Sequence, residues 1–269
     1  MRGLKKQRLD LLLVERKIAE SVDLARGLIG SGRVLIDNQV SDKAGSLINA
    51  DCLITVKNTR RFVSRGGDKL EAGLQGLHID PQGYICADIG CSTGGFTDCL
   101  LQYGASKVYS VDVGYGLLDW RLRQDKRVVV LERTNARYLT ADHIPDYIDL
   151  AVIDASFISL EPLLTPLLGL FHSAIRILAL VKPQFQLPRD KIGPGGIVSD
   201  ATLHQQALAM VQQFGLDLGL QCAGVIASPV RGMKGNQEFF MLLSGSSCAE
   251  SNGMKNLGQG DCDEVFESS

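Results

Sequence analysis

The stretch ADIGCSTGGFTDCLL, residues 87–101, joins a short apolar segment to an amphipathic segment through a glycine-rich turn. The apolar residues 84–89 around its start predict a buried strand, and residues 94–104 predict a helix. A strand that passes through such a turn into a helix is typical of the opening unit of a doubly wound α/β domain. This stretch therefore decides the fold class that we predict for most of the chain.

Predicted strands and helices alternate on the carboxyl side of this stretch. Their succession predicts an α/β domain with a doubly wound, mostly parallel, Rossmann-like sheet. The segment 183–199 is too rich in Pro and Gly for either element, so it is predicted to be a loop. Further strands are expected at 107–113, 127–132, 148–155, 175–182, 220–228 and 237–243, and further helices at 117–124, 160–171 and 201–214.

The N-terminal part of the chain has the pattern of a separate small α+β module. Apolar residues at helical spacing predict short helices over 9–16 and 25–29, with Ser21 as the N-cap of the second. Strand and turn patterns follow at 32–40 and 51–56. We therefore predict a small domain over residues 1–60, a polar linker over 61–68, a larger domain over 69–244 and a disordered acidic tail over 245–269.

Charge is distributed unevenly along the 269 residues. Residues 1–69 hold 14 Lys and Arg against 8 Asp and Glu, whereas the remainder holds 14 against 22. A basic head on an acidic body indicates a polyanion as the partner of the head. From charge alone, a solvated surface with a chance imbalance is an equally good interpretation.

Cysteine spacing and hydropathy exclude several classes of protein. The seven cysteines contain no C-x-x-C pair, so we expect no zinc site, no other metal and no disulfide scaffold, and the cytoplasm is the expected compartment. No apolar segment follows the basic N-terminus, so no signal peptide is expected. The most apolar stretch, 163–181, is interrupted by Pro166, His172 and Arg176, and we predict no association with a membrane.

The glycine turn carries the signs of a nucleoside-binding site. Ser92 stands where a dinucleotide fingerprint has the glycine that closes on a pyrophosphate, and S-adenosylmethionine has no pyrophosphate. Asp112 ends the next predicted strand, where a carboxylate can bind both ribose hydroxyls. A tight turn without a ligand is the alternative. The first strand and the turn supply four further candidates for cofactor binding: Asp88, Gly90, Gly94 and Gly95. The glycines would let the backbone come close to a bound nucleoside.

Longer motifs resemble those of the TlyA family, within the FtsJ-like ribose methyltransferases. They are DIGCSTGGFTDCLLQYGA, VDVGYGLLDWRLR, ERTNARYL, DLAVIDASFISL, LVKPQFQ and GNQEFF. RLDLLLVERKIAESVDLARGLIGSGRVLIDN resembles the S-four-type RNA-binding domain that this family carries in front. The resemblance, over roughly residues 5–243, implies a methyltransferase with S-adenosylmethionine as cofactor. It further implies ribosomal RNA, within ribosomal subunits, as the partner and the 2′-hydroxyl of cytidine as the target.

The same resemblance implies which residues form the site. The family's Lys-Asp-Lys-Glu catalytic tetrad is complete in this sequence, at Lys69, Asp154, Lys182 and Glu238. Its cofactor positions correspond to four residues, the last two of them in the adenine pocket: Ser92, Phe96, Asn135 and Ala136.

The tetrad suits methyl transfer to a ribose hydroxyl, which is a poor nucleophile until its proton is removed. We expect Lys182 to act as general base and Asp154 to orient it, while Lys69 and Glu238 position the ribose. Asp154 and Lys182 follow adjacent predicted strands, so they would face the same crevice as Gly90. Glu238 would join them if the last strand runs antiparallel. For any one such residue, a surface salt bridge is the alternative interpretation.

Two other methylation targets fit the sequence less well. Methylation of a cytosine carbon needs a nucleophilic cysteine. Cys91 would be misplaced for this role because it lies inside the cofactor turn, and Cys86 and Cys99 are expected in the core. Methylation of an exocyclic amine usually goes with an Asn/Asp-Pro-Pro-aromatic motif, where this chain has DASF at 154–157. Ribose methylation remains.

RNA contacts are expected from basic residues of the N-terminal module and the connector. Phosphate contacts position an RNA without reading its sequence, so we expect recognition of folded RNA by shape and backbone. Arg8 could equally form a structural ion pair with Asp10, and Arg65 could equally shape the linker. The candidates are Arg8, Arg26, Arg33, Lys43 and Arg65.

Three other functions are alternatives to ribosomal RNA methylation. A non-catalytic RNA-binding or ribosome-assembly factor would keep the fold, but the complete tetrad argues against it. A membrane-active hemolysin, after the family's other name, would need a long apolar or suitably amphipathic segment, and none is present. A nicotinamide-dependent oxidoreductase is disfavoured by the missing glycine.

Overall fold

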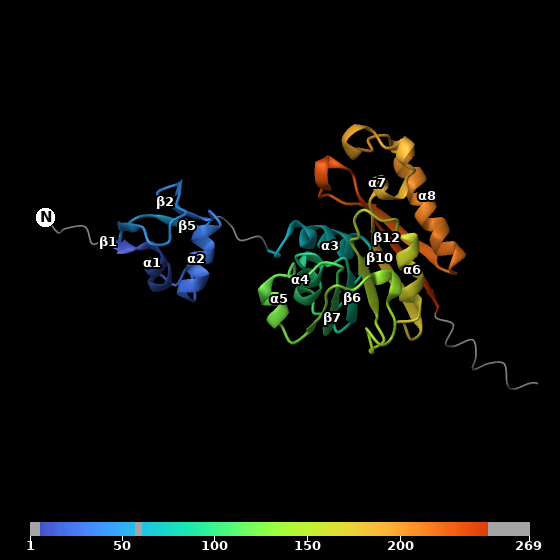
Figure 1. Cartoon of the computed structure of the whole chain (residues 1–269), viewed down its shortest axis with the longest axis horizontal. Helices are drawn as coiled ribbons and strands as arrows, with labels where there is room; N and C mark the ends of the chain where they lie inside the picture. The colour runs from blue at the N-terminus through green and yellow to red at the C-terminus, as the bar shows by residue number, and fades with distance from the viewer. Residues whose placement is uncertain (1–5, 57–60, 247–269) are drawn as a thin grey trace, which may run out of the picture. The chain divides into compact units, whose positions relative to one another are not determined.

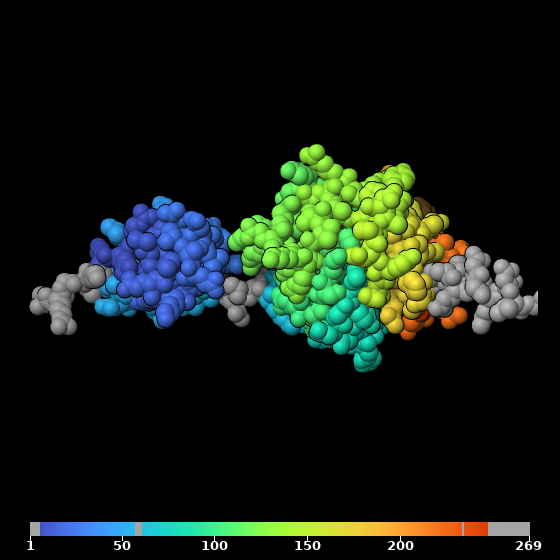
Figure 2. Space-filling view, turned by 90° about the horizontal axis from the view of Figure 1, so that it is seen from below, coloured from blue at the N-terminus to red at the C-terminus, as the bar shows by residue number. Residues whose placement is uncertain are grey.

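The chain forms two units, which a computed structural model describes over residues 6–56 and 61–246 (Figure 1). The division between the units falls between residues 60 and 61. Each unit has an apolar core of its own. The space-filling view shows one outer face of each unit (Figure 2).

The first unit packs two helices against short strands. Helices α1 (Leu9–Glu15) and α2 (Val22–Gly30) form where the apolar spacing predicts them, and the Ser21 hydroxyl caps α2 by accepting a hydrogen bond from the Leu24 N–H. The strands pair as β1–β4 and β3–β2–β5. Their bounds are β1 Lys6–Arg8, β2 Val34–Ile36, β3 Gln39–Val40, β4 Leu47–Asn49 and β5 Ile54–Val56. The sequence did not predict β1 and β4, which have three residues each.

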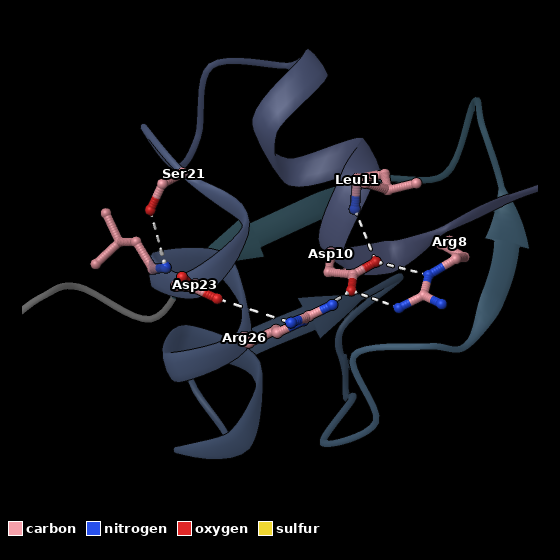
Figure 3. A network of polar contacts seen from close by, with 7 residues as sticks. Arg8, Asp10, Leu11, Ser21, Asp23 and Arg26 are labelled. Carbon is pink, nitrogen blue, oxygen red and sulfur yellow. Dashed lines mark hydrogen bonds and ion pairs between the residues drawn. The ribbon is translucent and has the colours of Figure 1, made fainter.

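A buried carboxylate ties the start of α1 to α2 (Figure 3). Asp10 accepts hydrogen bonds from Arg8 at 2.7 Å, from Arg26 at 3.3 Å and from the Leu11 N–H at 3.0 Å. The bonds from Arg8 are the main reason that the pKa of Asp10 falls to about 2, although burial opposes them. The structural ion pair considered for Arg8 is therefore present.

The second unit is built on a seven-stranded sheet of order β11-β12-β10-β9-β6-β7-β8. The five strands from β10 to β8 are parallel, as predicted, and β12 and β11 are antiparallel to their neighbours. The bounds are β6 Ile85–Ile89, β7 Lys107–Val111, β8 Val128–Leu131, β9 Leu150–Ile153, β10 Ala174–Val181, β11 Gln221–Ala227 and β12 Phe239–Ser246.

Helices cover both faces of this sheet (Figure 1). Helices α3 (Arg65–Gly76), α4 (Gly95–Gln102) and α5 (Trp120–Gln124) bury one face, and α6 (Glu161–Leu168) and α8 (Ala201–Asp217) bury the other. This is the doubly wound arrangement that the sequence predicts. Within the part of the chain that the structure describes, no helix combines the length and the apolar character that a bilayer crossing requires.

Three segments differ from their predictions. The predicted tail over 245–269 begins inside β12, which runs to Ser246, and its residues 247–269 lie outside the described residues. Helix α3 begins at Arg65, because the Ser64 hydroxyl accepts a hydrogen bond from the Gly66 N–H, so the end of the predicted linker is helical. The predicted loop 183–199 opens with a short helix, α7 (Pro183–Gln186), and contains two single 3-10 turns. Proline is tolerated at the first position of a helix, where no N–H is needed, and this explains α7.

A second buried carboxylate lies in the centre of the large sheet. The Asp88 side chain in β6 is fully buried, its Oδ2 accepts a hydrogen bond from the Thr97 hydroxyl at 2.6 Å, and that hydroxyl also lies 2.8 Å from Ser110 Oγ. Its Oδ1 has no hydrogen-bond partner among the residues that the structure describes. Burial raises the pKa of Asp88 to about 7.

We expect Asp10→Asn to loosen the first unit near neutral pH, because Arg8 and Arg26 lose an ionised partner. Hydrogen exchange followed by mass spectrometry should be faster in peptides from residues 6–56 than in wild type. Asp23→Asn, which removes only the exposed partner of Arg26, is the control and should exchange at the wild-type rate. Folding lowers the pKa of Asp10, so the stability that its ionised carboxylate gives the wild type is present above about pH 4 and declines towards pH 2. Equal exchange in Asp10→Asn and wild type at neutral pH would contradict this role.

Asp88 should make stability fall as pH rises between about pH 4 and pH 7. In that window the unfolded carboxyl is ionised while the folded one keeps its proton, so the folded state binds more protons. Asp88→Asn cannot ionise and should lose less stability over this range in urea unfolding. A stability difference between the two proteins that is independent of pH would show that the buried carboxyl does not titrate there.

Candidate active site

The predicted site residues meet at one edge of the sheet, where the parallel strands end. Gly90 follows β6, Asp112 follows β7, Asp154 follows β9 and Lys182 follows β10. The Asp154 N–H donates to the Ile89 carbonyl at 2.9 Å, which extends the β6–β9 ladder to the edge. Since β6 and β9 flank the point where the chain order reverses, this is the crevice in which doubly wound sheets bind ligands.

The turn after β6 is shaped by close backbone contacts. Gly90 has a φ of +82°, and a Cβ atom there would lie 2.8 Å from the Asp154 carbonyl oxygen. The Ser92 N–H donates to the Asp112 carboxylate at 2.8 Å, and the Gly114 N–H donates to its other oxygen at 2.7 Å. Two backbone donors therefore fix the Asp112 carboxylate beside the turn.

A cavity of about 400 Å³ opens at this edge, within the range that holds small-molecule ligands. Apolar side chains such as Val113 and Leu117 form much of its wall, and the Asp112 carboxylate is one of its few charged groups. A ring system and a pair of ribose hydroxyls need this combination, so the residues present fit an adenosine-containing cofactor. Six of the predicted residues line the cavity: Gly90, Ser92, Asp112, Asn135, Ala136 and Asp154.

Four predicted cofactor residues do not line this cavity. Asp88 lies in the core beneath the turn, and the space beside Gly94 is filled by the side chains of Leu118 and Leu122. Gly95 packs against the start of α3, and the Phe96 ring lies 6.0 Å from the ring of Phe240. Their positions are explained by packing, and a direct role in cofactor binding stays a prediction.

The four residues of the tetrad form two ion pairs. Lys182 Nζ lies 2.5 Å from Asp154 Oδ1, a contact too poorly aligned to be a hydrogen bond, and Lys69 Nζ lies 2.6 Å from Glu238 Oε2. The side chains of Lys182 and Glu238 are only 8% and 3% exposed. Solvent screens such pairs much less than surface pairs, so each lysine and its acid hold one another in place.

The two ion pairs come from distant parts of the chain. Lys69 lies on α3, and Glu238 directly precedes β12. Strand β12 runs antiparallel to β10, with Phe239 opposite Val181, so the condition set for Glu238 is met. Glu238 therefore lies at the same edge as Lys182.

Sequence reasoning missed Ser156, a polar residue of this site. The Ser156 hydroxyl accepts a hydrogen bond from Lys182 Nζ at 2.8 Å, and Ser156 also lines the cavity. It links the cofactor cavity to the lysine that we expect to act as base. Its only signal in the sequence was its place in the DASF segment, directly after the strand that ends at Ile153.

The predicted RNA contacts are basic residues with different surroundings. Arg8 and Arg26 are held by Asp10, yet their side chains remain 47% and 54% exposed, so ion pairing leaves both able to meet a phosphate. Lys43 is exposed, Arg33 is partly exposed before β2, and Arg65 is exposed at the first residue of α3. The RNA contacts themselves stay predictions.

Both units match known families. Residues 62–244 match the FtsJ-like methyltransferases, and residues 7–51 match the S4 domain.

Relatives extend the likeness over most of the chain. YqxC of Bacillus subtilis is 47% identical over 241 residues, which cover 89% of this chain and 86% of YqxC. The 16S/23S rRNA (cytidine-2′-O)-methyltransferase TlyA of Mycobacterium tuberculosis is 44% identical over 241 residues, covering 89% of this chain and 90% of TlyA. A solved Streptococcus thermophilus structure that carries the name hemolysin superposes with a TM-score of 0.68 at 38% identity and covers 90% of both chains. The chain thus belongs to the FtsJ-like methyltransferase family, among the TlyA proteins, and carries an S4 domain.

Proposed function

We propose that this protein methylates the ribose 2′-hydroxyl of cytidine in ribosomal RNA. The observation that carries the proposal is the shared position of Asp154, which lines the nucleoside-sized cavity and also pairs with Lys182. A methyl donor in that cavity would present its methyl group towards a basic side chain. The cytidine-2′-O specificity in the name of the Mycobacterium tuberculosis relative supports the choice of target.

The methyl donor of this family is S-adenosylmethionine, which supplies an activated methyl group. Asp112 would hold the two ribose hydroxyls of the donor, since its carboxylate is fixed by backbone N–H groups at the cavity wall. Asn135 and Ala136 would contact the adenine. The Asn135 side chain already accepts a hydrogen bond from the Arg137 N–H at 3.1 Å, which fixes its orientation.

Lys182, in its neutral form, would accept the proton of the target hydroxyl on its Nζ while the hydroxyl oxygen takes the methyl group and the sulfur–carbon bond of the donor breaks. Asp154 and Ser156 contact that Nζ from two sides and would keep it directed at the hydroxyl. Lys69, held by Glu238, would bind the ribose or its phosphate and exclude water from this edge. Holding the hydroxyl in line with the methyl group would supply much of the acceleration, because orientation alone is worth several orders of magnitude.

The S4 domain would supply the docking surface for RNA. Its exposed basic residues suit the phosphate backbone of a folded RNA, which they would position without reading its sequence. We propose ribosomal subunits as the partner, and ribosomes place the reaction in the cytoplasm. The complete, paired tetrad supports this enzymatic role over that of a non-catalytic assembly factor.

Lys182→Ala should lower methyl transfer from labelled donor to purified ribosomal subunits by about a hundredfold or more, because a general base is lost. Calorimetry should show that the variant still binds S-adenosylmethionine. Lys107→Ala, at the opposite edge of the sheet, is the matched control and should keep wild-type activity. Full activity in Lys182→Ala would exclude the proton-accepting role. A wild-type protein that binds RNA but labels no subunit would favour the assembly-factor alternative.

RNA affinity should fall steeply as salt concentration rises, because cationic side chains displace counterions from the RNA. Lys43→Ala should reduce the slope of log affinity against log salt by roughly 0.7 to 0.9, the effect of one lost phosphate contact. Lys126→Ala, exposed at the amino edge of the large sheet, should leave the slope unchanged. Filter binding at several salt concentrations measures this, and a flat response would exclude the basic docking surface.

A further inference from the structure

The Glu238 carboxylate occupies space that a side chain at position 232 would fill. Gly232 lies in the loop between β11 and β12, and a Cβ atom built on it would overlap Glu238 Oε1 and lie 2.6 Å from Glu238 Cδ. Glu238 is almost fully buried and its other oxygen contacts Lys69. A side chain at position 232 would therefore displace the Glu238 carboxylate that contacts Lys69.

The backbone around Gly232 is tied on both sides. The Ser228 N–H donates to the Glu238 carbonyl at 2.8 Å, and the Gly232 N–H donates to the Asn236 carbonyl at 2.9 Å. Gly232 is not among the residues with positive φ, so an alanine could adopt its backbone conformation without strain. Steric overlap with Glu238 is the specific effect of adding a methyl group at this position.

Asn236 fixes this loop to the segment that follows Lys182 and α7. Its buried side-chain amide accepts a hydrogen bond from the Val198 N–H at 2.9 Å and donates one to the Gly196 carbonyl at 2.8 Å. Val198 in turn packs against Leu187 and against Ala207 of α8. Since the loop is anchored in this way, the flexible Glu238 side chain is the group that would move away from an added methyl group.

We propose that Gly232 is a positioning residue for methyl transfer, because it gives the Glu238 carboxylate the place from which it holds Lys69. This inference rests on the proposed function of the tetrad. It assigns no contact with substrate to Gly232. The loop between β11 and β12 thereby becomes part of the catalytic architecture, although Glu238 is the only member of the tetrad that it adjoins.

The first test is the rate of methyl transfer by Gly232→Ala at saturating S-adenosylmethionine. We expect a fall of roughly tenfold to a hundredfold, the cost of displacing a positioning group by about an ångström. Cofactor affinity by calorimetry should be unchanged, since Gly232 does not line the cavity. The matched control is Gly169→Ala at the end of α6, where a Cβ meets nothing within 4 Å, and it should keep the wild-type rate.

A double-mutant cycle separates positioning from a general structural effect. Once Glu238→Ala has removed the carboxylate, the added methyl group has nothing to displace, so Gly232→Ala should cause no further loss of rate in that background. An equal fall in both backgrounds, or a wild-type rate for Gly232→Ala alone, would overturn the proposal.

The same cycle measured by thermal unfolding keeps the inference apart from the proposed function. Gly232→Ala should lower Tm in the wild-type background and leave it unchanged in the Glu238→Ala background. If the wild-type protein methylates no ribosomal substrate, the proposed function fails while this coupling still tests the contact. Equal Tm changes in both backgrounds would overturn the role of Gly232 whatever the substrate is.

Discussion

The antiparallel pairing of β12 with β10 is the interaction on which the site depends. Their ladder runs from Ala174 opposite Ser246 to Val181 opposite Phe239. A residue that precedes a parallel strand would lie at the far edge of the sheet, but the reversed direction of β12 brings Glu238 to the edge that carries Lys182. A slip of two residues would move Glu238 along the strand by about 7 Å, out of reach of Lys69. The register of one strand pair thus decides whether the tetrad can assemble.

The sheet could be predicted from the residues alone, whereas the tetrad was implied by the family resemblance. Apolar segments alternating with amphipathic ones indicated the parallel strands, and polar residues directly after such strands must meet at one edge. This logic explains why Asp154 and Lys182, once named by the resemblance, were expected at one edge. It could not pair Lys69 with Glu238, which are far apart in the sequence. Ser156 was missed because its contact depends on the conformation of the loop after β9.

Glycine was the residue type that the sequence resolved least well. A glycine that admits a ligand and a glycine that admits a neighbouring helix look the same in a motif. Gly90 lines the cavity, whereas the space beside Gly94 is filled by leucine side chains. Charge had a similar limit, because the sequence offered the pairing of Arg8 with Asp10 as one alternative but gave no sign that Arg26 shares the buried Asp10. In each case the deciding fact is a neighbour contributed by another segment.

The contact between α3 and α4 has a consequence for the position of Lys69. A Cβ atom on Gly95 would lie 2.9 Å from the Gly67 nitrogen and 3.0 Å from the Gly66 Cα, so these helices meet backbone to backbone. Gly67 stands two residues before Lys69. The residues just before it are held as well, because Phe62 is buried in the core of the second unit and the Val63 N–H donates to the Asp98 carboxylate at 2.8 Å. The spacing between Lys69 and the turn after β6 is therefore set by a close helix contact that a side chain on Gly95 would force apart.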